Sequence, residues 1–362
     1  MARRLWRSFD WALLGTAVLL IIYGVAMISS ATRGTPDMAN LWQRQALLAA
    51  SGLVVLFLVA AFDYRFYENL HRSLYVLIIA LLIVVFVVGE MTQGVQRWLG
   101  ASAIQPSELA KIVIVIGLAR LLADHDGEMD QLRYLLLSLG YVLLPMLLIY
   151  LQPDLSTALM LGLIWLLMAL MAGVQLVHLG ALAAASVFAS PLVWFTLQDY
   201  MRERILLFID PRGNPDDYYN VQQALISIGS GGWLGKGFGN GTQSQLHFLR
   251  VRHTDFIFSV ISEELGLLGA IVLLALFVFL LWRILRVATM AQDPFGRLIC
   301  VGVGVTIFLQ TTINVGVNLG LLPVTGLPLP FVSYGGSSLW TFLVSLGLVE
   351  SVAMRHKKLD FE

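Results

Sequence analysis

The sequence predicts an all-α polytopic membrane protein with about ten transmembrane helices and one long extracellular loop. Of its 362 residues, 58% are hydrophobic and 13% are charged, and the mean hydropathy is +0.80. Apolar runs of about 20 residues, the length that crosses a bilayer core as a helix, recur along the chain. These runs are too long for barrel strands. We expect a single transmembrane domain over residues 1–362, with no separate soluble domain and no internal repeat.

Each helix is expected where an apolar run lies between polar or helix-breaking residues. The first run follows three arginines and exceeds a signal-peptide core, so we expect a retained helix. The sixth and seventh runs are separated only weakly, at Ala172-Gly173. The polar segment of about 198–255 between the seventh and eighth runs is the predicted extracellular loop. The expected helices are 9–30, 43–62, 70–89, 107–123, 132–151, 155–172, 175–197, 256–287, 296–319 and 336–354.

The distribution of Lys and Arg predicts the orientation. With the N-terminus in the cytoplasm, more than half of the 23 basic residues fall in cytoplasmic segments or the adjoining helix ends, as the positive-inside rule requires. Both termini are then cytoplasmic. The polar segments 90–106, 152–154, 198–255 and 320–335 all face the outside. This clustering predicts a functional site on the extracytoplasmic side.

Several function classes are disfavoured by composition. The net charge of +0 offers no bulk attraction to nucleic acid. The sequence has neither a P-loop nor a Rossmann fingerprint, so chemistry powered by ATP is not expected. The six histidines are scattered and give no metal-ligand spacing. The lone Cys300 excludes an intramolecular disulfide and is expected to be a small buried hydrophobe.

Asp255 lies where a glycine-rich polar stretch meets the eighth helix. A structural interpretation is available, because acids favour helix N-termini and Thr254 could also cap there. The functional alternative is that the apolar residues 256–258 lower the local dielectric, raise the carboxylate pKa and make Asp255 a better base. Glu263 and Glu264 lie about 80° and 180° around the helix from Asp255, so at least one should pair with another helix.

The fourth helix opens with Pro106-Ser107-Glu108, and Lys111 follows one turn into the apolar run. Glu108 and Lys111 have the i, i+3 spacing of a helical pair. One interpretation is a structural ion pair with a snorkelling lysine. The other is a buried cation that awaits a phosphate oxygen.

Three other outside features carry polar or irregular sequence. Arg97-Trp98 indicates either an interfacial aromatic belt or a contact to a lipid headgroup or sugar. Gln152-Pro153-Asp154 favours a tight turn that caps the sixth helix. The Pro- and Gly-rich stretch 320–338 cannot form a regular helix, and we expect it to be re-entrant beside the site.

Five separated motifs, in order, resemble the SEDS family (shape, elongation, division and sporulation), and the resemblance covers essentially the whole chain. They are Gln105-Pro106-Ser107-Glu108-x-x-Lys111, Gln152-Pro153-Asp154, the Gly229–Gly241 run, His253-Thr254-Asp255-Phe256-Ile257-Phe258, and Asn314 through Ser338. Within the last motif, Val324-Thr325-Gly326-Leu327-Pro328 resembles the RodA branch.

This resemblance implies a peptidoglycan glycosyltransferase, a hexosyltransferase that polymerises lipid II on the outer face of the bacterial cytoplasmic membrane for elongation and rod shape. Lipid II is the undecaprenyl-pyrophosphate-linked disaccharide peptide. The implied catalytic base is Asp255, acting in an inverting transfer. The resemblance also assigns the family's paired Glu and Lys to Glu108 and Lys111 and its loop arginine to Arg204. Further candidate substrate-binding residues are Arg97, Trp98, Asp154, Thr254 and His253.

The resemblance also implies a partner, a class B penicillin-binding protein with transpeptidase activity, and contact with membrane lipid. No organic cofactor is expected, while the departing pyrophosphate would suit a divalent cation, Mg or Mn. Two other functions are weighed against the transferase: a flippase for the lipid-linked precursor, and a non-catalytic scaffold for the transpeptidase. The intramembrane acids suit a flippase, but the sequence shows no inverted repeat of the kind many transporters have. The glycine run is interpreted as a mobile loop over the lipid-linked sugars.

Overall fold

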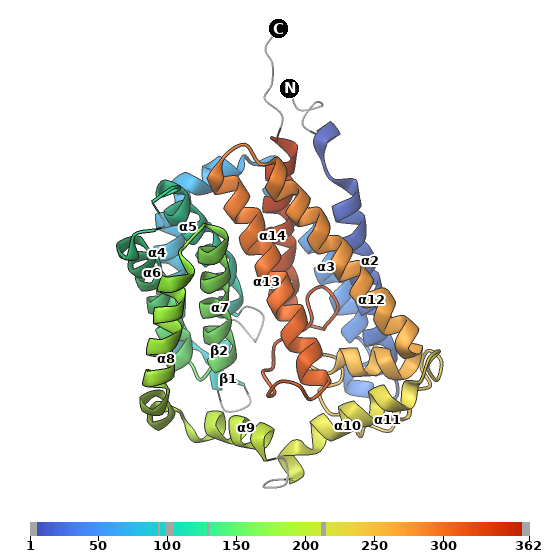
Figure 1. Ribbon diagram of the computed structural model, residues 1–362. Coiled ribbons are helices and arrows are strands. Elements are labelled where there is room, and N and C mark those ends of the chain that lie inside the picture. The colour runs from blue at the N-terminus through green and yellow to red at the C-terminus, as the bar shows by residue number, and fades with distance from the viewer. Residues whose placement is uncertain (1–5, 93–94, 99–104, 129, 211–214, 357–362) are drawn as a thin grey trace.

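The computed structural model describes residues 6–92, 95–98, 105–128, 130–210 and 215–356, and it is dominated by long helices (Figure 1). The long apolar helices are α2 Trp11–Ala31, α3 Leu41–Ala61, α4 Tyr64–Val88, α5 Pro106–Asp124, α6 Leu132–Leu151, α7 Leu155–Met171, α8 Leu176–Thr196, α12 Ile257–Met290, α13 Pro294–Asn318 and α14 Gly336–Met354. The shorter elements are η1 Trp6–Ser8, η2 Pro36–Met38, β1 Glu90–Thr92, β2 Val95–Trp98, α9 Asp199–Ile209, α10 Pro215–Gly231 and α11 Thr242–Gln245.

Each long helix coincides with one predicted apolar run. Within the described residues, seven are long and apolar enough to cross a membrane: α2, α3, α4, α6, α12, α13 and α14. Two others, α7 and α8, contribute shorter apolar stretches, and α5 carries Glu108 and Lys111. The all-α polytopic membrane class is therefore confirmed, while the number of about ten spans stays a prediction.

Three local features differ from the sequence expectation. The helix of the third predicted run, α4, begins at Tyr64 rather than at 70, because the Asp63 side chain accepts the Arg65 N–H and starts the helix early. Part of segment 90–106, which the sequence predicts to lie outside, forms the antiparallel pair β1–β2. The long polar segment 198–255 is predicted to be a loop, but it contains the helices α9, α10 and α11, which lie across one end of the bundle (Figure 1).

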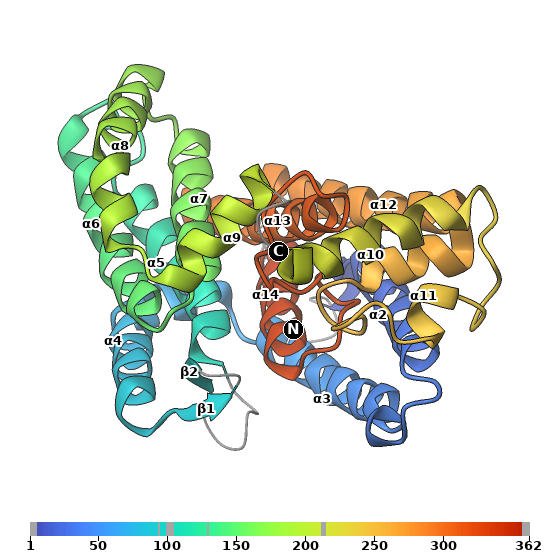
Figure 2. The ribbon, with the colours of Figure 1, turned by 90° about the horizontal axis from the view of Figure 1, so that it is seen from below.

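The helices form two groups on either side of α13 (Figure 2). One group contains α4 to α8, and the other contains α2, α3, α12 and α14. The central helix α13 packs against α5 and α7 on one side and against α12 and α14 on the other. Cys300 is buried in α13, as predicted. Side chains of α13 can therefore contact residues of both groups.

The helix α12 is broken at Gly266, which has φ 67° and ψ −165°. A left-handed φ of this kind favours glycine. The break would leave backbone groups unpaired, and the glycine segment, defined here as residues 231–245, pairs them. Leu267 N–H donates to the Gly232 carbonyl at 2.9 Å, and Lys236 N–H donates to the Glu263 carbonyl at 3.0 Å. The glycine segment is therefore built into the helix break.

The two intramembrane acids hold this arrangement from α12. Glu263 accepts from Lys236 Nζ at 2.8 Å and from the Gln243 N–H at 3.0 Å, while Glu264 accepts from the Gly239 N–H at 3.0 Å and from the Ser30 hydroxyl of α2. Both glutamates are fully buried. The expectation that at least one pairs with another helix is confirmed for Glu264. These contacts differ from the interpretation of the glycine run as a mobile loop, because buried carboxylates fix its backbone.

The proline segment, defined here as residues 320–335 between α13 and α14, is irregular and folded into the protein. Leu327, Leu329, Phe331 and Val332 are buried within it. Irregular backbone at membrane depth is tolerated where protein surrounds it. The predicted absence of a regular helix is confirmed over residues 320–335, whereas residues 336–338, which that prediction also included, begin α14.

Candidate active site

Asp255 lies in the turn before α12, and two amides of α13 hold that turn in place. The Asp255 carbonyl accepts from Asn314 Nδ2 at 3.0 Å and from Asn318 Nδ2 at 2.9 Å. Asn318 also accepts the Ser259 N–H at 3.1 Å and the Ser259 hydroxyl at 2.6 Å, which satisfies the first turn of α12. The cap residue is Phe256, with no side-chain capping bond. The Asp255 carboxylate is therefore not used as a helix cap.

The Asp255 side chain is half-buried and faces the proline segment. A methyl group added to Gly326 would lie 3.8 Å from Asp255 Oδ2. Burial raises the pKa of Asp255 to about 6, against the opposing effects of the Thr254 hydroxyl and the Arg204 charge. A carboxylate with this pKa is mostly ionised at neutral pH and is a stronger base than an exposed aspartate.

The proline segment binds the main chain on both sides of Asp255. Tyr334 N–H donates to the His253 carbonyl at 2.9 Å, and the Ser333 hydroxyl donates to the Thr254 carbonyl at 2.6 Å. The His253 and Tyr334 rings lie 5.9 Å apart, and burial together with the Arg252 charge lowers the pKa of His253. The lowered pKa favours the neutral form of the His253 imidazole. The expectation that the proline segment lies beside the Asp255 site is confirmed.

Lys111 and Glu108 form a buried ion pair one turn into α5. Lys111 Nζ lies 2.7 Å from Glu108 Oε1 and 2.8 Å from Gln310 Oε1 of α13, and it lies over the Phe342 ring at 5.5 Å. The Lys111 side chain has almost no exposed surface. The structure supports the ion-pair interpretation, and the predicted contact to a phosphate oxygen stays a prediction.

Gln310 connects this ion pair to the proline segment. Its Nε2 donates to the Pro328 carbonyl at 2.8 Å, and Asn314 Nδ2 donates to the adjacent Leu327 carbonyl at 2.9 Å. Gln310, Asn314 and Asn318 recur every fourth residue and so share one face of α13. Sequence reasoning missed Gln310 and Asn318 as site residues. Buried amides at i, i+4 and i+8 in an apolar helix are a signal that could have found them.

Arg204 of α9 also contacts the proline segment. Its Nη1 donates to the Val324 carbonyl at 3.3 Å. With Phe208, Tyr218 and Pro323 among its neighbours, it lines a cavity of about 80 Å³. Its charge acts on Asp255, as described above. Arg204 therefore contacts the same proline segment that Asp255 faces, and its predicted role in substrate binding stays a prediction.

The remaining predicted site residues Asp154, Trp98 and Arg97 lie on α7 and β2 or at their ends. Asp154 caps α7, with Oδ1 accepting the Thr157 N–H at 3.2 Å and Oδ2 accepting its hydroxyl at 3.0 Å, as the tight-turn interpretation predicts. Trp98 is half-buried in β2. The Arg97 backbone also belongs to β2, but its side chain lies outside the described part of the structure.

No three His, Cys, Asp or Glu side chains cluster as metal ligands within the described part of the chain. Glu108 Oε2 is buried without a hydrogen-bond partner among those residues, but its neighbour is the Lys111 ammonium group. This donor set does not fit a resident Mg or Mn ion. A divalent cation would have to arrive with substrate phosphates, as Mg²⁺ commonly does.

Comparison with known proteins agrees with this arrangement. The model of the FtsW/RodA/SpoVE family, described as cell cycle protein, matches residues 8–358. The peptidoglycan glycosyltransferase MrdB of Escherichia coli K12 is 38% identical, over 97% of this chain and 95% of its own. The probable peptidoglycan glycosyltransferase FtsW of Geobacter metallireducens is 36% identical, over 96% of each chain.

Solved structures also match over nearly the whole chain. One comes from work on the coordination of polymerization and crosslinking by a peptidoglycan synthase complex; its TM-score is 0.84 and its identity 31%, over 97% of this chain and 99% of that one. The rod shape determining protein RodA of Thermus thermophilus has a TM-score of 0.72 at 30% identity, over 97% and 98% of the two chains. Motifs, fold and relatives together show that this chain belongs to the FtsW/RodA/SpoVE family of SEDS proteins, as its sequence predicts.

Proposed function

We propose that this protein is a peptidoglycan glycosyltransferase of the RodA type that polymerises lipid II for cell elongation. The observation that carries the proposal is Asp255, a half-buried carboxylate with a raised pKa, which is held by α13 beside a proline segment that Arg204 also contacts. An acid and a cation held at one irregular segment suit a transfer that needs a base and a stabilised anionic leaving group. The glycosyltransferase names of the relatives support the same activity.

In the proposed reaction, the acceptor sugar hydroxyl attacks the anomeric carbon of the donor in one displacement. The new glycosidic C–O bond forms as the bond to the pyrophosphate oxygen breaks, and the lipid pyrophosphate leaves with the electron pair. Asp255 takes the proton of the attacking hydroxyl, which is worth about 10²–10⁴-fold in rate. Arg204 stabilises the departing pyrophosphate. Arg97, Trp98, His253 and Thr254 are proposed contacts to the lipid-linked sugars.

Lys111 and Glu108 are assigned a positioning role. Their ion pair fixes Gln310, and Gln310 holds the Pro328 carbonyl in the segment that faces Asp255. Direct contact between Lys111 and phosphate would require this region to open.

The proposed sidedness follows from the two ends of the bundle. Arg7 and His356, near the two termini, line one pocket at the end of α12. Asp255 precedes the start of α12, at the end of the bundle that carries α10 and α11 (Figure 1). Because the arginine-rich end is expected inside, we place both termini in the cytoplasm and Asp255 on the extracytoplasmic side of the bacterial cytoplasmic membrane.

The proposed partner is a class B penicillin-binding protein that cross-links the new strand. The solved structure with the higher TM-score comes from a study of a synthase complex that coordinates polymerization and crosslinking. This supports a division of labour in which our chain polymerises and the partner supplies transpeptidation. A scaffold without its own active site would need no base with a raised pKa.

The test is polymerisation of purified lipid II in detergent by the wild type and by Asp255→Asn, with glycan strands resolved on a gel. Asp255→Asn should lose about 10²–10⁴-fold in rate while remaining folded. Asp199→Asn, at a fully exposed aspartate of α9, is the matched control and should retain activity. A wild type without product in detergent would leave the flippase or scaffold functions standing. Near-normal synthesis by Asp255→Asn would refute the base.

A further inference from the structure

A basic pocket lies at the end of the bundle that carries the termini, far from Asp255. It has a volume of about 310 Å³ and is lined by the segment before α2, the end of α12 and the end of α14. About 28 residues of α12 separate Asp255 from Arg283, which corresponds to roughly 40 Å of helix before the break at Gly266 is considered. The pocket therefore does not belong to the active site.

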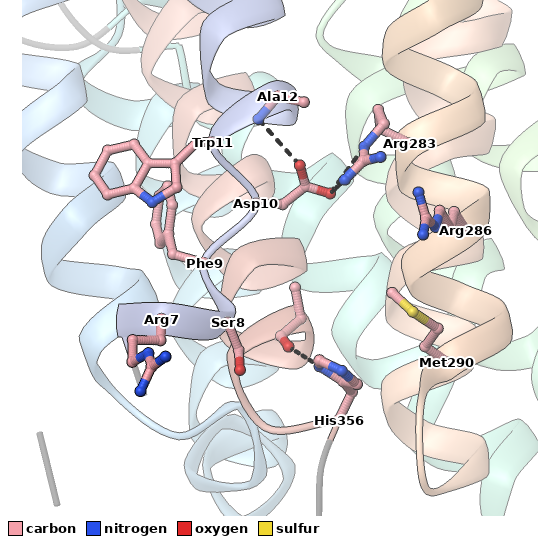
Figure 3. Close-up of a pocket in the computed structure, with 11 residues that line it drawn as sticks. Arg7, Ser8, Phe9, Asp10, Trp11, Ala12, Arg283, Arg286, Met290 and His356 are labelled. Carbon is pink, nitrogen blue, oxygen red and sulfur yellow. Dashed lines mark hydrogen bonds and ion pairs between the residues drawn. The ribbon is translucent and has the colours of Figure 1, made fainter. Parts of the chain in front are cut away.

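Three arginines give the pocket its charge. Arg7 lies on the side of the segment that precedes α2, and Arg283 and Arg286 lie on the facing side, from α12 (Figure 3). Arg283 Nε donates to Asp10 Oδ2 at 2.9 Å, so this arginine is neutralised by an aspartate of the same pocket. Behind Asp10, the buried Glu350 accepts the Asp10 N–H at 2.9 Å.

Two of the arginines keep their charge available. Arg7 and Arg286 are exposed, and neither guanidinium group forms an ion pair with a carboxylate within the described residues. His356 adds a half-buried imidazole to the wall. The pocket lining thus has an excess of positive charge and several N–H donors, which is the chemistry that recognises a phosphate group.

The surroundings of the pocket are those of a membrane interface. Trp11 borders the pocket and is 61% exposed, and Trp282, over which Arg286 lies at 5.9 Å, is 51% exposed. Exposed tryptophans of this kind mark headgroup depth. The helices α2 and α12 pack together and carry exposed apolar side chains further along, among them Ile22 and Val278. A molecule in the pocket thus has lipid-facing helix surface beside it.

We propose that this pocket binds the phosphate headgroup of an anionic phospholipid, with its acyl chains along α2 and α12. Basic pockets between transmembrane helices at the cytoplasmic surface recognise such headgroups, and each arginine contributes on the order of 5-fold in affinity. The shared chemistry is a phosphate ester anion. A free phosphate would bind the same groups but gain nothing from the tryptophans or the apolar helix faces.

The test uses the full-length protein in neutral detergent, with retained lipid counted by native mass spectrometry. Phosphatidylglycerol and phosphatidylcholine are titrated separately onto the wild type, the double variant Arg7→Gln/Arg286→Gln, and the control Arg72→Gln/Arg133→Gln. The control removes the same charge from exposed positions of α4 and α6. We expect the wild type to retain phosphatidylglycerol over phosphatidylcholine, the pocket variant to lose about 10-fold or more of this binding, and the control to keep it.

A competition arm separates the two sources of phosphate. Millimolar inorganic phosphate should not displace phosphatidylglycerol, and displacement at that level would overturn the lipid assignment in favour of a soluble phosphate. Equal retention of the two lipids by the wild type would overturn the proposal without any variant. Equal losses in the pocket and control variants would overturn it too, because general surface charge would then explain binding.

Discussion

Two segments contact the beginning of α12, and they differ in role: one stabilises the helix break, and the other lies beside Asp255. The glycine segment, residues 231–245, is bound by the buried carboxylates Glu263 and Glu264 and repairs the helix break at Gly266. The proline segment, residues 320–335, is bound mainly by amides and hydroxyls together with Arg204, without a buried carboxylate among these contacts, and it leaves the Asp255 carboxylate half-buried. Two segments that contact the same helix therefore have different consequences. One segment completes the scaffold, and the other shapes the site.

This comparison predicts a division between stability and activity. Changes in the glycine segment should lower the free energy of unfolding and spare catalysis in the molecules that remain folded. Changes in the proline segment should do the reverse. The Lys111–Glu108 pair is expected to affect both, because it is buried and also holds the proline segment through Gln310.

The largest effect is expected from Lys111→Met. This substitution leaves Glu108 buried without its cation, which typically costs about 3–5 kcal/mol in the free energy of unfolding. Activity should fall as well, because Gln310 loses the contact that positions it. The double variant Lys111→Met/Glu108→Leu should recover part of the stability, since no unpaired charge remains. Thermal unfolding in detergent measures both, and equal stabilities for the two variants would contradict the ion-pair account.

Glu264→Leu comes next and tests the glycine segment. It removes the acceptor of the partly buried Gly239 N–H and of the buried Ser30 hydroxyl, at a cost of about 1–3 kcal/mol. Polymerisation per folded molecule should remain close to wild type below the unfolding transition. Unchanged stability accompanied by a large loss of activity would instead make the glycine segment part of the site.

The smallest change in stability is expected from Gly326→Ala. The residue has φ 72°, so alanine introduces strain of about 1 kcal/mol, and its methyl group would lie 3.8 Å from Asp255 Oδ2. We expect at least about a 10-fold loss of polymerisation, because the methyl occupies space beside the base. Gly34→Ala is the matched control, with φ 75° and open space around the added methyl. The same loss of activity in both variants would attribute the effect to strain alone.

Much of the scaffold could be predicted from sequence because lipid imposes long apolar runs. The bounds of α6, α7 and α14 agree with the predicted runs to within a residue. The kink in α12 could not be predicted in this way, since it depends on residues 231–239 returning to meet Gly266. The helices α9 to α11 were also missed as elements, because a polar segment that lies along a membrane surface lacks the continuous apolar pattern used to find spans.

Site residues whose side-chain chemistry is unusual for their position could be predicted from the sequence. Residues that act only by binding other residues of the fold could not. Asp255 is conspicuous as an acid at the start of an apolar helix. Asn318 and Gln310 act only through carbonyls brought close by the fold, so their importance required the structure. Lys111 shows the opposite case. From the sequence, a charge in an apolar helix suggests a ligand contact. In the structure, Lys111 is buried and binds Glu108 and Gln310 instead.

The most direct test of the account is the pH dependence of polymerisation under subsaturating lipid II. Burial raises the pKa of Asp255 to about 6, so the base is ionised above that pH and becomes protonated as the pH falls through it. Activity should therefore be retained above about pH 6 and be lost on the acid side. Because the Arg204 charge lowers the pKa of Asp255, Arg204→Gln should move this midpoint upward. A wild-type rate that does not change between pH 5 and 8, or an unmoved midpoint in Arg204→Gln, would contradict Asp255 as the base beside Arg204.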